Sequence, residues 1–83
     1  MKEKQFPNGF TNWMETHHEV VEFITRNSDH GEIKRRRQLQ GIGGIYELAE
    51  EWTDEFEKLH EGREWDGDYF DELQDFLTLK NNA

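Results

Sequence analysis

Apolar positions recur at three- and four-residue steps in three separate stretches of the chain, and this is the period of an amphipathic helix. The first stretch follows Asn12, a suitable N-cap, ends near Arg26 and carries Trp13, Met14, Val20, Val21 and Ile24. The second carries Ile45, Leu48, Ala49, Trp52, Phe56 and Leu59, which fall within about 100° of a helical wheel. The third follows Asp68 and carries Tyr69, Phe70, Leu73, Phe76 and Leu77. Three amphipathic helices on short connections predict an all-α fold, a compact three-helix bundle.

The segment before the second helix has a less regular pattern. Asp29 with Glu32 fits a capping box and Gly41 fits a C-cap, which favours a short helix between them. Ile33 and Leu39 are six positions apart, however, and do not share a helical face. The pattern therefore allows a fourth short helix in the 30–40 segment, and we expect the glycines of residues 41–44 to break the chain after it.

Length limits the architecture to one unit. The chain has 83 residues, which predicts a single small helical domain over residues 1–83. Residues 6–10 form a predicted turn at its start, and Gly62 is the expected stop of the second helix. A chain of this size buries too little surface to enclose a deep active-site cavity.

Charge divides the chain into two unlike halves. The net charge is −9, and residues 45–83 hold thirteen acids and three bases, whereas residues 1–44 hold six acids and seven bases. A strongly anionic half repels nucleic acid and anionic lipid, so we expect a protein partner with a cationic surface and regard nucleic acid as an unfavoured ligand. The carboxylates expected to form the partner-binding face are Glu47, Glu50, Glu51, Asp54, Glu55, Asp71, Glu72 and Asp75.

The absence of cysteine removes thiol chemistry and disulfides, which favours a reducing compartment. The first residues lack the apolar stretch of a secretion signal, and no run of about 18 apolar residues occurs. We therefore expect a cytoplasmic protein without a membrane-spanning segment.

Two Glu-x-x-His motifs, Glu15 to His18 and Glu57 to His60, have the spacing that di-iron helical bundles use. On the first helix, however, Glu15 and His18 lie opposite the apolar side and would face water. His17 is expected at the edge of the core. We predict solvated polar residues in these motifs, with no bound metal and no cofactor.

Residues 28–30 are Ser, Asp and His, the three members of a hydrolase triad, but adjacent residues cannot form the required relay of side chains. Asp66, Gly67 and Asp68 suggest calcium binding, yet they lack the donor spacing of an EF-hand loop. No catalytic residue is predicted, and the protein is expected not to be an enzyme.

A basic, glycine-containing segment is the main alternative site. Leu39 to Gly43 superficially resembles the hairpin of the helix-hairpin-helix DNA-binding motif over five residues, although Glu47 stands where that motif has a small residue. The resemblance implies backbone amides that grip a phosphate, with cations supplied just upstream. The residues of this candidate anion site are Lys34, Arg35, Arg36, Arg37, Gly43 and Gly44. Two other interpretations stay open: a solvated basic patch beside a flexible turn, and a patch that docks on acidic residues of this chain or of another copy.

Trp65 lies between the second and third predicted helices. It either closes the end of the bundle or is an exposed aromatic anchor for a partner. Together these patterns predict a non-enzymatic helical interaction protein that binds a cationic protein partner. Alternatives are phosphate or nucleic-acid binding through residues 34–44, and a nucleic-acid mimic whose carboxylates imitate phosphates.

Overall fold

The computed structural model describes residues 13–61 and 68–82, and within them the chain is all-α. Helix α1 covers Trp13–Arg26, α2 covers Gly31–Leu59 and α3 covers Tyr69–Asn81. The expected end of the first helix at Arg26 and the start of the third after Asp68 are confirmed. The predicted turn at 6–10, the Asn12 cap, the Gly62 stop and Trp65 lie outside the described residues.

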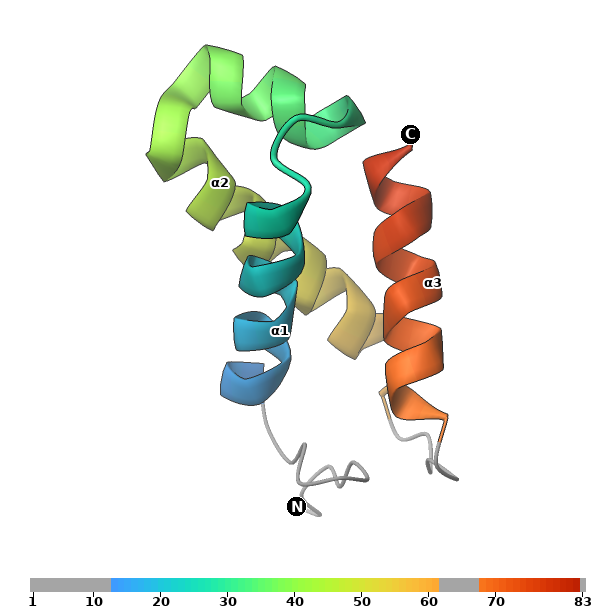
Figure 1. Ribbon diagram of the computed structural model, residues 1–83. Helices are drawn as coiled ribbons and strands as arrows, with labels where there is room; N and C mark the ends of the chain where they lie inside the picture. The colour runs from blue at the N-terminus through green and yellow to red at the C-terminus, as the bar shows by residue number, and fades with distance from the viewer. Residues whose placement is uncertain (1–12, 62–67, 83) are drawn as a thin grey trace.

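The long helix α2 organises the bundle (Figure 1). Its second part, residues 42–59, passes behind α1 and α3, which run in roughly the same direction across it. Its first part, residues 31–40, lies across the end of the bundle where α3 finishes. There Gly31 lies directly against the backbone carbonyl of Asn81, so the start of α2 touches the end of α3.

A single residue bends α2. Gly41 has φ 67° and ψ −150°, a backbone conformation that essentially only glycine adopts, and helical geometry resumes directly after it. The separate fourth helix over 30–40 is therefore not shown, because these residues form the first part of α2. The expected break over 41–44 is confined to Gly41, and Gly43 and Gly44 are helical.

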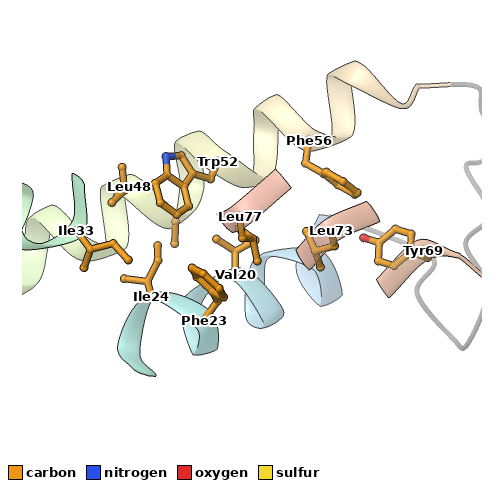
Figure 2. Packing of buried hydrophobic residues seen from close by; sticks show 11 residues of the cluster. Val20, Phe23, Ile24, Ile33, Leu48, Trp52, Phe56, Tyr69, Leu73 and Leu77 are labelled. Carbon is orange, nitrogen blue, oxygen red and sulfur yellow. The ribbon is translucent and has the colours of Figure 1, made fainter. Parts of the chain in front are cut away.

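The core follows the predicted faces of α2 and α3. Figure 2 shows one continuous cluster that runs from Ile33 and Ile24 at one end to Phe56 and Tyr69 at the other. The predicted members that are buried are Val20, Ile24, Leu48, Ala49, Trp52, Phe56, Tyr69, Leu73 and Leu77. Two predicted members on these helices, Leu59 and Phe70, are exposed.

The buried face of α1 differs from the predicted one. Thr16 and Phe23 are buried, whereas Met14 is 69% exposed. This shift corresponds to a rotation of the core-facing side by about 70° on the helical wheel. The polar hydroxyl of Thr16 hides this face in the sequence, since Thr16 and Phe23 are two turns apart on the same side.

The caps at the helix ends agree with the prediction only in part. The N-cap of α2 is His30 in an extended conformation, so the predicted pairing of Asp29 with Glu32 does not define its start. Asp68 is the N-cap of α3, as predicted, but its side chain makes no capping hydrogen bond. At the end of α1 the Phe23 carbonyl accepts two hydrogen bonds from Asn27, one from its backbone N–H at 3.0 Å and one from its side chain at 2.9 Å.

Candidate functional site

The predicted acidic residues lie on the outer sides of α2 and α3. All of them are exposed except Glu72, which is half-buried. On α2 the acids recur at steps of three and four residues opposite the core side chains, so they form a band along the helix. The residues of this acidic band are Glu47, Glu50, Glu51, Asp54 and Glu55.

Half of the eight carboxylates are already engaged by the chain itself. Glu51 accepts two hydrogen bonds of 3.2 Å from Arg36, and Asp54 accepts one from the Trp13 indole. Glu55 is bonded by the Lys80 ammonium at 3.0 Å. The fourth is half-buried Glu72 on α3, whose carboxylate lies 4.0 Å from the imidazole of His60.

The other half are available to a partner. Within residues 13–61 and 68–82, no side-chain hydrogen bond or ion pair involves Glu47, Glu50, Asp71 or Asp75. These four carboxylates are exposed on two helices, and each therefore presents its negative charge to solvent.

The basic segment is partly neutralised. The Arg36 side chain passes over Gly44, which is buried beneath it, and reaches Glu51 on the second part of α2. This hydrogen bond raises the pKa of the Arg36 guanidinium, although partial burial acts in the opposite direction. Residues 36 and 51 would lie about 22 Å apart along a straight helix, so the bend at Gly41 brings them together.

The remaining predicted anion-binding residues are more open. Lys34, Arg35, Arg37 and Gly43 are exposed, with Arg35 paired to Glu32. Arg37 lies 3.6 Å from the carboxylate of Asp29. Because residues 42–44 are helical, the hairpin that the resemblance implied is not formed. For Arg36 the geometry matches docking on acidic residues of the same chain.

A buried chain of polar groups crosses the other end of the bundle. The Thr16 hydroxyl donates to the Glu57 carboxylate at 3.1 Å and accepts a hydrogen bond from the Tyr69 hydroxyl. All three residues are at least nine-tenths buried, so the prediction that Glu57 faces water is wrong. Burial, followed by the negative charge of Glu57, raises the pKa of Tyr69 to about 12, while the Thr16 hydrogen bond partly offsets this.

This polar chain is not part of any metal-binding cluster found among the described residues. Among the described residues, no three His, Asp or Glu side chains lie close enough to hold a metal ion. His18 pairs with exposed Glu22 at 2.9 Å, and His60 directs its Nδ1 to the Phe56 carbonyl. Ser28 accepts a hydrogen bond from Arg37 rather than joining a relay with its two neighbours.

The sequence did not indicate the groove beside the bend of α2. It has a volume of about 300 Å³ and is lined by Val21, Thr25, Ser28, Arg37, Ile42, Ile45 and Tyr46. Leu39, Ile42 and Tyr46 are 75%, 72% and 57% exposed, so apolar side chains face solvent on this side.

None of the helices built from the described residues combines the length and the apolar character needed to cross a bilayer. Compared with protein-family models, with curated proteins and with solved structures, the chain matches none of them. The function must therefore be argued from its surface.

Proposed function

We propose that this protein is a non-enzymatic helical interaction protein whose acidic surface binds a cationic protein partner. The observation that supports the proposal is the set of exposed, unengaged carboxylates at Glu47, Glu50, Asp71 and Asp75. Opposite charges on two surfaces speed their encounter and exclude partners of the wrong sign.

The charges of the chain support a partner of this sign. Arg36 and Lys80 are hydrogen-bonded to Glu51 and Glu55, and among the described residues neither forms an ion pair with any of the four open carboxylates. A cationic partner would neutralise charges that otherwise repel one another along the acidic band.

Capture from lysate at low and high salt tests the proposal. The neutralised bait carries Glu47→Gln, Glu50→Gln, Asp71→Asn and Asp75→Asn, and the matched control changes Glu15, Glu22, Asp29 and Glu61 in the same way. We expect one basic protein to be retained by the wild type and by the control at about 50 mM salt, and to be lost from the neutralised bait. Retention of nothing at low salt, or equal retention by both variants, would refute the proposal.

A nucleic-acid mimic is the narrower version. The three- and four-residue spacing of the acidic band gives carboxylates about every 5 Å along one side of α2, which could imitate a phosphate track. In that case polynucleotide added during capture displaces the partner. A partner that stays bound under polynucleotide competition excludes the mimic but leaves the broader proposal in place.

Phosphate or nucleic-acid binding through the basic segment is the alternative. Exposed Lys34, Arg35 and Arg37 support it, whereas the helical geometry of residues 42–44 removes the hairpin amides. Titration with polynucleotide at about 50 mM salt, where such binding is strongest, should give a signal that falls in the Arg35→Ala, Arg37→Ala variant. A flat titration excludes this alternative.

A further inference from the structure

The charge of α2 changes sign at Tyr46. Residues 33–45 contain four bases and no acid, and residues 47–55 contain five acids and no base. Tyr46 itself is 57% exposed and lines the groove beside the bend. Arg37 lines the same groove as Tyr46, and the exposed acids Glu47 and Glu50 follow Tyr46 on α2. Exposed charges of both signs therefore flank one aromatic side chain, although Arg36 is bonded to Glu51 across the bend.

Exposed apolar side chains occupy the centre of this arrangement. Ile42 and Tyr46 are one helical turn apart, and Glu50 continues the same stripe by another turn. Leu39 adds a further exposed apolar group on the other side of Gly41. The groove next to Tyr46 has room for one large side chain from outside the molecule, since its volume is about 300 Å³.

We propose that a second copy of this chain docks here, in an antiparallel two-fold contact centred on Tyr46. A two-fold axis brings the same patch of both copies together, so that whatever lies before Tyr46 in one copy meets what lies after it in the other. The exposed bases Lys34 and Arg37 of one copy thus face the exposed acids Glu47 and Glu50 of its partner, and the contact is repeated on the other side of the axis. Arg36 stays bonded to Glu51 of its own chain.

Other binding partners would complement only one of the two signs of charge on this surface. An anionic membrane would attract Lys34 and Arg37 but would be repelled by Glu47 and Glu50, which adjoin the same apolar stripe. An acidic peptide meets the same conflict. A second copy complements both signs at once, because its charges are reversed by the symmetry of the contact.

The contact is distinct from the proposed function and is tested on the purified protein alone. The exposed apolar centre is small, so we expect a salt-sensitive dimer with a dissociation constant of about 10–100 µM. Sedimentation equilibrium at about 50 mM salt, over a concentration series that spans this range, measures it. Tyr46→Glu should weaken the dimer by at least about tenfold, since it places two like charges at the centre.

The control for Tyr46→Glu is Leu79→Glu. Leu79 is 73% exposed on α3 and lies outside the charge reversal of α2, so this change should leave the dimer intact. Both substitutions are at exposed helical positions, and far-UV circular dichroism checks that each variant keeps its helices.

Charge reversal provides a second test, whose expected result cannot arise from destabilisation of the fold alone. One variant carries Lys34→Glu with Arg37→Glu, and the other carries Glu47→Lys with Glu50→Lys. Each variant alone should be monomeric, because like charges then meet on both sides of the axis. An equal mixture should form a heterodimer, since the symmetry pairs opposite signs again on both sides.

Three results would overturn the proposal. The first is a wild type that stays monomeric throughout the series, including one that instead co-sediments with phosphatidylserine vesicles. The second is a dimer that keeps its affinity in Tyr46→Glu, whether or not Leu79→Glu weakens it. The third is a mixture of folded charge-reversed variants that shows no heterodimer.

Discussion

Thr16 occupies a core position of α1 where an apolar residue would ordinarily pack, and its hydroxyl joins Tyr69 to Glu57. The hydrogen bonds run in one direction, from phenol to hydroxyl to carboxylate, and such chains strengthen each member. A buried carboxylate is costly without donors, so Thr16 helps to make Glu57 tolerable between helices.

Alkaline pH should destabilise the protein through Tyr69. Its pKa rises from an ordinary value of 10 to about 12 in the folded state, so the stability it contributes is complete below pH 10 and is lost as the pH rises through 12. The free energy of unfolding should fall by about 2 kcal/mol across this range on account of this group. Denaturant titrations at several pH values measure the decline.

Phenylalanine substitutions at the two tyrosines test whether Tyr69 causes this decline in stability. Tyr69→Phe should flatten the decline, whereas Tyr46→Phe should retain it and leave Tyr69 as the only tyrosine for absorbance titration. An equally steep decline in Tyr69→Phe would contradict the assignment.

Thr53 should be more stable as valine. Its side chain is fully buried in α2, and within the described residues its hydroxyl has no hydrogen-bond partner. Thr53→Val removes an unsatisfied polar group at nearly constant volume, so the free energy of unfolding should rise by about 1 kcal/mol, or the melting temperature by about 4–8 °C. Thr25→Val is the matched control, because the exposed Thr25 hydroxyl bonds the Val21 carbonyl. Its effect should stay within about 0.5 kcal/mol, and a destabilised Thr53→Val would show that the hydroxyl does have a partner.

The two parts of α2 are held together at close range. A Cβ atom on Gly44 would lie 2.6 Å from the Gln40 Cβ and 3.1 Å from the Arg36 Cγ. Glycine at this position lets the first part fold back, and the Arg36 to Glu51 bond then spans the bend. The bend therefore depends on a backbone turn at one glycine and a close approach at another.

Alanine substitutions at three neighbouring glycines should change the free energy of unfolding in different directions. Gly43→Ala should raise the free energy of unfolding by about 0.5–1 kcal/mol, because Gly43 is helical and exposed, and an added methyl group would have no neighbour within 4 Å. Gly44→Ala should lower it by about 1–3 kcal/mol through overpacking. Gly41→Ala should lower it by a similar amount, about 1–3 kcal/mol, through backbone strain. Urea denaturation compares the three, and a uniform effect would show that the segment is a flexible linker.

Periodicity predicted the elements better than their ends. The narrow apolar stripe of α2 and the Tyr69, Leu73 and Leu77 side of α3 follow directly from helical spacing. The merged helix over 31–59 could not be predicted, because a run of glycines is typical of a break and only tertiary packing makes Gly44 helical. Seven of the eight carboxylates of the expected partner-binding face are exposed, and half-buried Glu72 lies beside His60.

The sequence predicted the charge of the candidate site but not the contacts within it, because these depend on tertiary structure. Charge is readable from composition, but the engagement of Glu51 by Arg36 depends on the bend, and the groove depends on how α1 crosses α2. The buried position of Glu57 was hidden too, since its donor Thr16 comes from another helix.

The whole molecule carries more negative charge than its ion pairs balance. A net charge of −9 on a chain of 83 residues destabilises the compact state through self-repulsion, and salt screens it. The exposed pairs Arg36–Glu51 and Lys80–Glu55 weaken in salt, but each is worth less than about 1 kcal/mol.

Sodium chloride should therefore stabilise the protein. Raising it from about 10 mM to about 500 mM should increase the melting temperature by several degrees, measured by circular dichroism at low protein concentration. The variant with neutral side chains at residues 47, 50, 71 and 75 should show a smaller increase. A melting temperature that falls with salt would mean that the ion pairs outweigh the repulsion.

The backbone turn at Gly41 also sets the direction in which α2 bends. It decides on which side of the second part of α2 the first part closes over the bundle. Its φ of 67° and ψ of −150° mirror the polyproline II region, which L residues enter freely. A D-alanine at this one position would consequently sit in its own relaxed region, and by restricting the unfolded chain it should stabilise the protein by up to about 1 kcal/mol. The fold thus contains a site where an amino acid of inverted chirality fits better than any of the natural L residues.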